Sequence, residues 1–289
     1  MTNSLIGKKY AVVVAHPDDE ILWASSILEN AEKIIICFND LASNEKLSSS
    51  RSRLQLEYPL KNVHFLNIDE ASINNQKVNY EKKYETIYGI KGKKNQDEYK
   101  KSFLEIKKSL VTHILNIDTI YTHSPWGEYG NVDHIQVFNV IKNLAEIYNY
   151  KIFIFGSFSG KNYDYMKSKL TSVKSSLKFP VNKSIYQTIK KIYIKYNCWT
   201  WDKNYNLNNY DIFFEISPFE INQKKFCNLD IYANYIFPEN LGIFKKGYFT
   251  SKLVRIYSKK IIFHIIKIKM IYSLNSLVIF LSKLFCIKK

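Results

Sequence analysis

The sequence predicts an α/β protein with a mostly parallel sheet and flanking helices, followed by a helical, basic C-terminal extension. Two observations lead to this prediction: short apolar runs alternate with helical patterns through the body of the chain, and the last 45 residues are apolar and basic without a single acidic residue. The 289 residues are 46% hydrophobic and 24% charged, with only 9 Gly and 6 Pro. This composition excludes disordered, collagen-like and low-complexity chains.

The first predicted elements alternate between buried strands and helices. The apolar run over residues 10–15 predicts a strand, and the apolar spacing over 20–30 predicts the helix that follows it. A second apolar run predicts a strand over 33–38. The polar segment over 43–58 fits a helix that ends before Pro59, because proline disfavours helical backbone in the residue preceding it.

The middle of the chain continues this order around one long insertion. A third strand is expected over 63–66, and residues 69–96, rich in Lys, Asn and Tyr, are expected to form a loop of a length that is commonly functional. Helical spacing resumes over 97–115, a fourth strand is expected over 119–122, and 133–148 again has the pattern of a helix.

The remainder of the body is less regular. We expect a fifth strand over 151–155, a Lys- and Tyr-rich helical stretch up to residue 196, a strand over 212–216 and a helix over 219–235. No clear linker and no internal repeat divides this part of the chain. Residues 1–244 are therefore predicted to form one domain and 245–289 the extension.

The net charge of +16 is concentrated at the C-terminal end. Residues 245–289 contain ten Lys, one Arg and no acidic residue, so the body itself is only mildly basic. Just three of the 42 basic residues are Arg, the side chain preferred for two-pronged contacts with phosphates and base edges. A nucleic-acid partner is therefore not expected.

The cysteines and the N-terminus indicate a cytoplasmic protein. The four cysteines lie far apart without a CxxC pair, which argues against a disulfide scaffold and a thiolate zinc site and favours a reducing compartment. The apolar stretch over residues 11–15 is too short for a signal peptide. Secretion is therefore not expected.

The end of the extension predicts contact with a membrane. Between Lys269 and Lys283 lie 13 uncharged residues, fewer than the ~20 of an uninterrupted span. We favour an interfacial helix over 261–289 on an anionic leaflet, which would place the protein peripherally on the inner face of the membrane. The alternatives are a helix packed on the body or on a second subunit, and a short tilted span anchored by its terminal lysines.

The first motif with chemical content is His16-Pro17-Asp18-Asp19-Glu20, at the end of the first predicted strand. Ligands of open α/β sheets bind beyond the carboxyl ends of the strands, so a site is expected there. One imidazole and one carboxylate can bind a metal while the other carboxylate stays free as a base. The alternative is a plain helix N-terminus, where the acidic residues cap amides and complement the helix dipole.

A second segment rich in His and carboxylates follows the fourth predicted strand, from His123 to His134, with Gly127-Glu128-Tyr129-Gly130 inside it. Because both segments lie at the same edge of the sheet, they can complete one site. The remaining histidines have no partner pattern and are interpreted as structural: His64, His113 and His264.

His-Pro-Asp-Asp-Glu followed about a hundred residues later by Gly-Glu-Tyr-Gly-x-x-x-His resembles the PIG-L/LmbE family of metal-dependent N-deacetylases. The resemblance covers residues 8–156, extends more weakly to about 235 through Trp199-Thr200-Trp201, and does not include the tail. It implies a Rossmann-like sheet that holds zinc, or another divalent metal such as Fe²⁺, and an N-acetylated sugar as substrate. The two tryptophans are expected either to stack on a sugar or to pack in the core.

The resemblance also implies roles for individual residues. His16, Asp19 and His134 match the three metal ligands of the family. Asp18 matches the general base. Two His and one Asp leave coordination positions open for water, which is the arrangement of a catalytic rather than a structural metal site.

Further matches concern the substrate and the oxyanion. Tyr129 matches a tyrosine that stabilises the oxyanion in some members, and Asp133 matches an acidic residue beside the active-site histidines. Arg53 matches a substrate-contacting arginine, although Arg51 is equally placed. At the position of Asn131 the family usually has a histidine that protonates the leaving amine or supports the oxyanion; asparagine can hydrogen-bond an oxyanion but cannot supply a proton.

These observations predict a zinc-dependent hydrolase that removes the N-acetyl group of an amino sugar, linked to a nucleotide or lipid carrier in surface-glycan synthesis. The carrier and the pathway rest on the range of the family and on the basic tail. Two alternatives stay open. One is a membrane-associated metal- or glycan-binding pseudoenzyme, motivated by Asn131, and the other is a different metal-dependent amidohydrolase.

Overall fold

The computed structural model describes residues 9–40, 44–70, 80–81, 84–92, 96–170, 173–202, 205, 207–217 and 233–236. The main sheet has seven strands: β1 (Tyr10–Val14), β2 (Lys33–Asp40), β3 (Val63–Asp69), β6 (Thr119–Thr122), β7 (Lys151–Phe155), β9 (Val173–Pro180) and β10 (Tyr210–Ile216). Their order is β3-β2-β1-β6-β7-β10-β9. The first five strands in this order, β3, β2, β1, β6 and β7, are parallel to one another. Strand β10 is antiparallel to both of its neighbours, β7 and β9. The sheet confirms the predicted α/β class.

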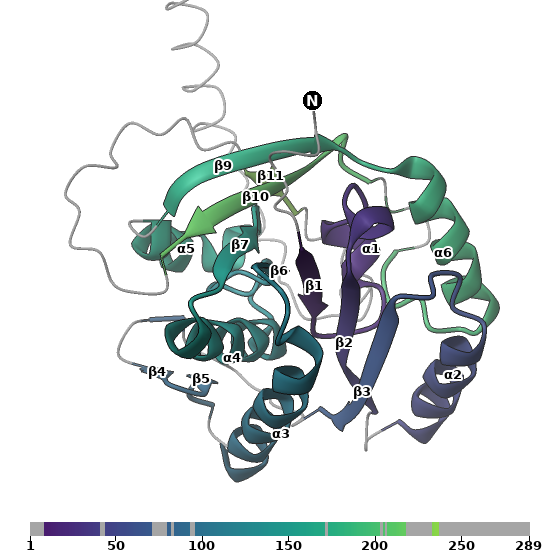
Figure 1. Cartoon of the computed structure of the whole chain (residues 1–289), viewed down its shortest axis with the longest axis horizontal. Coiled ribbons are helices and arrows are strands. Elements are labelled where there is room, and N and C mark those ends of the chain that lie inside the picture. The colour runs from purple at the N-terminus through teal and green to yellow at the C-terminus, as the bar shows by residue number, and fades with distance from the viewer. Residues whose placement is uncertain are drawn as a thin grey trace, which may run out of the picture. The chain divides into compact units, whose positions relative to one another are not determined.

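Helices cover both sides of this sheet (Figure 1). They are α1 (Asp19–Trp23), α2 (Glu45–Leu56), α3 (Gln96–Ile114), α4 (Val132–Tyr148), α5 (Tyr163–Lys169) and α6 (Lys183–Lys195). Alternate residues of β1, Ala11 and Val13, share a core cluster with α3 and α4, whereas α1, α2 and α6 lie on the other side of β1 to β3. All five residues of β1 are buried, as expected for a parallel strand covered on both faces.

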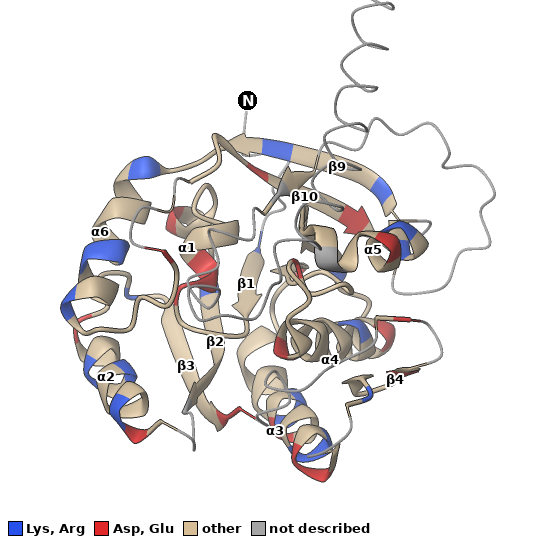
Figure 2. Ribbon diagram, turned by 180° about the vertical axis from the view of Figure 1, so that it is seen from behind, with Lys and Arg blue, Asp and Glu red and all other residues tan. Residues whose placement is uncertain are grey.

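The strand order has its switch point at β1. From β1 the chain continues to β2 and β3 on one side, and β6 and β7 occupy the other side. The loops that leave the carboxyl ends of β1 and β6 therefore diverge at a topological switch point, where open α/β sheets bind ligands. Figure 2 shows acidic residues on α1, which begins just beyond the carboxyl end of β1.

The helix predicted over 20–30 is shorter in the structure. Helix α1 ends at Trp23, and only a turn of 3₁₀ helix follows at Leu28–Asn30. The intervening loop is fixed by Asp211, whose carboxylate accepts hydrogen bonds from Ser25 Oγ at 3.2 Å and Ser26 N at 2.7 Å. These two long-range hydrogen bonds hold the segment as a loop, although its apolar spacing is that of a helix.

The stretch predicted to be helical up to residue 196 contains the edge strand β9 as well as α5 and α6. In β9 burial alternates at nearly every residue, a period-two pattern, and the strand pairs with β10. Two short strand pairs were also not predicted: β4 (Glu85–Thr86) with β5 (Gly89–Ile90) inside the 69–96 insertion, and β8 (Ser157–Phe158) with β11 (Asn234–Tyr235).

Two predicted elements lie mainly or wholly outside the described residues. Most of the helix expected over 219–235 falls there, and the described end of that range forms β11 instead. The entire extension over 245–289 falls there too, so its boundary and its helix stay predictions. Among the described helices, none is both long enough and apolar enough to cross a membrane.

Candidate active site

The loop between β1 and α1 carries the first motif in a buried and tightly held form. Asp18 has a φ of 97°, in the left-handed region that non-glycine residues seldom adopt. Glu20 supports this turn, since its Oε2 accepts from Asp18 N at 3.1 Å and its Oε1 from the hydroxyls of Tyr58 and Tyr193, both at 2.7 Å. Burial raises the pKa of Glu20 to about 7. Glu20 thus joins the loop to two distant segments, a structural role.

The loop after β6 carries the second motif and turns through Gly127 and Glu128, both with positive φ. A Cβ on Gly127 would lie 2.3 Å from the carbonyl oxygen of Asn131, so only glycine fits there. The turn points the Glu128 carboxylate inward, where its Oε2 lies 2.9 Å from His123 Nδ1 and 2.5 Å from His134 Nδ1.

The two motifs bring together one donor atom each from His16, from Asp19 at the start of α1 and from His134 in the first turn of α4. Asp19 Oδ2 lies 3.3 Å from His16 Nδ1 and 3.3 Å from His134 Nε2. A tetrahedral zinc ion with bonds of about 2.0–2.1 Å separates its ligand atoms by about 3.3 Å, so these spacings suit one shared ion. His134 Nε2 is buried and has no hydrogen-bond partner among the described residues, as expected of a metal-binding lone pair. The three donors therefore fit a divalent cation.

His123 is excluded from this triad by its own hydrogen bonds, although its Nε2 lies 3.4 Å from Asp19 Oδ2. That nitrogen accepts the Ala15 N–H at 2.8 Å, which assigns the proton to Nδ1 facing Glu128. His123 thus joins β1 to the second loop through both of its ring nitrogens. The carboxylate of Glu128 also fixes the proton of His134 on Nδ1 and so leaves its Nε2 free for a metal.

Replacing Glu128 by glutamine is expected to lower zinc affinity by ~10–100-fold, the usual effect of losing the outer partner of a metal-bound histidine. The amide can donate a proton to His134 Nδ1 and so favour the tautomer with the hydrogen on Nε2. Competition with a fluorescent zinc chelator measures the affinity. The matched control is Glu215→Gln, at a half-buried carboxylate on β10, which should leave the affinity unchanged. Equal affinities of all three proteins would contradict the role of Glu128.

A cation that binds this site would have to displace protons from it. Burial lowers the pKa of His134, but Asp19 and Glu128 outweigh this effect and raise it to about 9. The pKa of Asp19 itself lies well below its ordinary value, because His134 and His123 outweigh the effect of burial. Zinc requires the neutral imidazole, so binding must release the proton of His134.

Zinc binding at pH 7 is accordingly expected to release at least one proton, and the apparent affinity should rise about tenfold per pH unit for each released proton up to about pH 9. The sign follows from the raised pKa, since lower pH favours the protonated, metal-free form. Titration calorimetry in buffers of different ionisation enthalpy counts the protons. Zinc binding without proton release would contradict the raised pKa.

The second ring nitrogen of His16, Nε2, joins this residue to another polar network. This nitrogen is 3.3 Å from Asp133 Oδ2 and 3.6 Å from Glu70 Oε1, and Glu70 is paired at 3.0 Å with Arg51. Burial lowers the pKa of His16, but Glu70, Asp133 and Asp19 raise it well above its ordinary value overall. Asp133 therefore orients the imidazole of His16 and is not itself one of the three donors of the triad.

The two candidate arginines have different surroundings. Arg51 is buried and joins this network through Glu70, whereas Arg53 is exposed on α2. Arg51 is thus the one that the described structure connects to the site. A substrate role for either side chain stays a prediction.

Asp18 lies beside the triad without belonging to it. Its Oδ2 accepts from Thr200 Oγ1 at 2.7 Å and Thr200 N at 3.3 Å. Burial and the charge of Asp19 raise the pKa of Asp18 well above its ordinary value. Thr200 is exposed, so this contact lies at the solvent side of the site. The tryptophans on either side of Thr200 were candidates from the sequence, but no local pattern pointed to the threonine itself.

Aromatic side chains pack beside the triad. Trp201 is buried and meets Trp23 and Tyr129 edge to face, at centroid distances of 5.4 and 5.7 Å. Tyr129 in turn lies 5.3 Å from the His134 ring. Trp201 therefore packs in the core, the second of the two predicted roles, and it supports Tyr129. Trp199 packs near Tyr186 and Tyr193.

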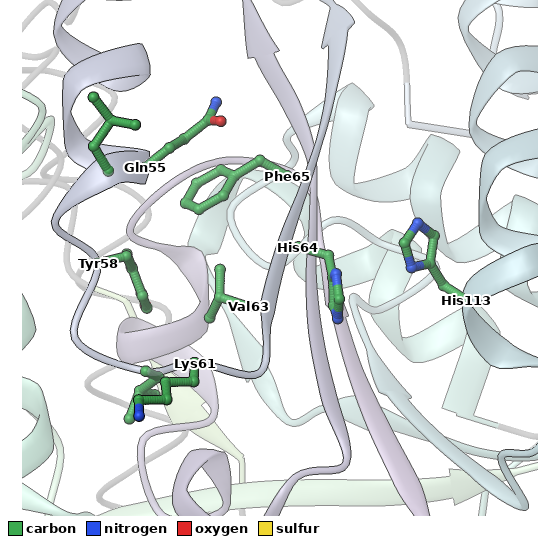
Figure 3. A pocket seen from close by; sticks show the side chains of 9 residues that line it. Gln55, Tyr58, Lys61, Val63, His64, Phe65 and His113 are labelled. Atoms are coloured by element: carbon green, nitrogen blue, oxygen red, sulfur yellow. The ribbon is translucent and has the colours of Figure 1, made fainter.

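A depression of about 550 Å³ on another part of the molecule contains His64 and His113 (Figure 3). The two rings are 4.9 Å apart, and burial together with Lys33 lowers the pKa of both. His64 stands near the start of β3, at the amino ends of the strands, so this depression is separate from the triad. His264 lies outside the described residues.

A switch-point α/β sheet with an Asp and two His at the carboxyl ends of β1 and β6 defines a candidate single-metal hydrolase. Residues 11–145 match the family model of PIG-L, described as GlcNAc-PI de-N-acetylase. Residues 11–145 thus form a PIG-L-type domain, which confirms the resemblance to this family of N-deacetylases. A comparison with curated proteins finds no match.

Several solved structures are similar to the chain. They include the A40926 pseudoaglycone deacetylase Dbv21 (8% identity, TM-score 0.49, covering 74% of this chain and 98% of that one) and the zinc-inhibited form of teicoplanin deacetylase Orf2 (10% identity, TM-score 0.48, covering 72% and 98%). A third is the N,N'-diacetylchitobiose deacetylase from Pyrococcus horikoshii (13% identity, TM-score 0.38, covering 66% and 71%).

Proposed function

We propose that the protein is a zinc-dependent N-deacetylase of an N-acetylated amino sugar. The observation that carries the proposal is the convergence of His16 Nδ1, Asp19 Oδ2 and His134 Nε2, each within 4.8 Å of the others. The family match supports the reaction, because its description is that of a de-N-acetylase of an N-acetylglucosamine compound. Zinc suits the two imidazoles and one carboxylate, and Fe²⁺ is the alternative ion.

A divalent cation held by this triad would polarise the acetyl carbonyl and lower the pKa of water. Asp18 is the carboxylate left free to accept the proton of the attacking water. The Tyr129 hydroxyl stays protonated, because burial and Asp19 raise its pKa well above 10, and it can donate to the oxyanion.

The leaving nitrogen must gain a proton, and the surrounding groups narrow the choice of donor. Asn131 has no acidic proton, and both ring nitrogens of His123 are engaged. The two histidines beside Glu128 outweigh its burial and lower its pKa to about 2, so it is a carboxylate at neutral pH. Asp18 is therefore assigned both steps, taking the proton of water and returning it to the amine.

Mass spectrometry of acetylated sugars incubated with zinc-loaded protein tests the proposal. Free, nucleotide-linked and lipid-linked N-acetylamino sugars are compared, with metal-free protein as the control. Loss of one acetyl group only in the zinc-loaded sample is the expected result. Sugar binding without any loss would instead favour the pseudoenzyme, and hydrolysis confined to other amides would favour a different amidohydrolase.

The carrier and the membrane form the second part of the proposal. A nucleotide- or lipid-linked substrate in surface-glycan synthesis fits a cytoplasmic enzyme whose residues 261–289 hold it on the inner leaflet. Deleting residues 261–289 should reduce binding to anionic liposomes but leave binding of a water-soluble substrate unchanged. High salt should weaken binding of the intact protein to the same liposomes, because screening reduces the attraction between lysines and anionic lipids. Neutral liposomes are the control. An intact protein that ignores anionic liposomes would exclude the membrane role.

A further inference from the structure

Asn131 begins helix α4 and uses both ends of its side-chain amide. Its Oδ1 accepts from Asp133 N at 2.8 Å, which makes it the N-cap of the helix. Its Nδ2 donates to the Tyr129 hydroxyl at 3.0 Å. Only 8% of Asn131 is exposed. The side chain is thus held at one end by the helix and directed at the other toward Tyr129.

The direction of this second hydrogen bond is fixed by chemistry. The Nδ2 group of asparagine can only donate, so the Tyr129 oxygen must accept and its own O–H hydrogen is directed elsewhere. The Tyr129 ring is held by edge-to-face contacts with His134 and Trp201, at 5.3 and 5.7 Å between centroids. The hydroxyl hydrogen is therefore available beside a predicted metal ligand.

We propose that Asn131 is a positioning residue, which makes Tyr129 a hydrogen-bond donor to the oxyanion of the proposed reaction. This role rests on the proposed deacetylase function. It differs from the role expected from the sequence, in which Asn131 itself contacts the oxyanion. It also accounts for asparagine at this position, because one short amide supplies both the helix cap and the donor to Tyr129.

The test reverses the hydrogen bond and keeps the cap. In Asn131→Asp the carboxylate still accepts from Asp133 N, and a negative charge at a helix N-terminus is favourable. The same carboxylate would now attract the Tyr129 O–H hydrogen away from the oxyanion. We expect kcat to fall ~10²-fold, the loss typical of one oxyanion donor, with KM, zinc content and thermal unfolding nearly unchanged.

A double-mutant cycle with Tyr129→Phe separates this effect from the added charge. If Asn131 acts through Tyr129, Asn131→Asp should cost almost nothing further in kcat in the Tyr129→Phe background. An equal loss in both backgrounds would overturn the proposal and restore direct contact between Asn131 and the oxyanion. An unchanged kcat in the single variant would overturn it as well.

An NMR measurement, which does not depend on turnover, completes the test. In protein labelled with ¹³Cζ-tyrosine, Tyr129→Phe identifies the Tyr129 resonance, and Asn131→Asp should shift it while leaving other tyrosines in place. An unshifted resonance would mean that the hydrogen bond is absent, which overturns the proposal. Lack of activity in the unmodified zinc-loaded protein would refute the deacetylase function itself, whereas an active protein without coupling refutes only the role of Asn131.

Discussion

Replacing Asp19 by asparagine is expected to remove zinc from the protein and to abolish turnover. Its Oδ2 is the atom shared by the triad, 3.3 Å from both His16 Nδ1 and His134 Nε2. A neutral amide cannot replace a carboxylate ligand whose charge holds the cation. The loss of zinc affinity should exceed the ~10–100-fold expected for an outer partner such as Glu128. Elemental analysis of purified protein and the mass-spectrometric assay measure the two effects.

The control is Asp211→Asn, at a carboxylate that is also buried and hydrogen-bonded but lies on β10 and contacts Ser25 and Ser26. This variant should keep its zinc, so a general effect of neutralising a buried carboxylate is separated from loss of a ligand. Circular dichroism of both variants reports whether they fold. A folded Asp19→Asn protein with a full equivalent of zinc would refute the triad.

Local patterns predicted the elements that position the site. Strands β1 and β6 and helix α4 agree with the predicted ranges to within a residue, because each is set by a short apolar run or a helical repeat. The two motifs directly follow these strands, and parallel strands end at the same edge of a sheet. The meeting of the two motifs at one edge of the sheet was therefore predictable, whereas the choice of His16, Asp19 and His134 among their residues came from the family resemblance.

Other features depend on contacts between distant segments and had no local signal. Thr200 reaches Asp18 across 182 positions of sequence, and Asp211 fixes the loop after α1 from a similar distance. The choice between Arg51 and Arg53 depends on which face of α2 is buried, and that helix is too polar for its pattern to show this. The lysine-rich strand β9 was missed because its partner β10 follows it later in the chain.

Asp18→Asn is expected to keep zinc and to lose most turnover, about 10²–10⁴-fold, the usual contribution of a general base. Asp18 lies outside the triad, so the ligand atoms are untouched, and the new amide oxygen can still accept from Thr200. An amide cannot accept the proton of water at neutral pH. Because burial and Asp19 raise the pKa of Asp18, the acid limb of the kcat/KM profile should lie above the ordinary carboxyl range, with activity rising as Asp18 loses its proton.

Thr200→Val is the matched variant for this prediction, because it removes a hydrogen bond from the same carboxylate and leaves the base in place. It should keep zinc and lose far less turnover than Asp18→Asn. The hydroxyl of Thr200 lowers the pKa of Asp18, so its removal should move the acid limb of kcat/KM to higher pH. If Asp18→Asn loses zinc as completely as Asp19→Asn, Asp18 is a ligand and the proton acceptor must be another group. If Asp18→Asn keeps both zinc and turnover, the reaction does not use this carboxylate.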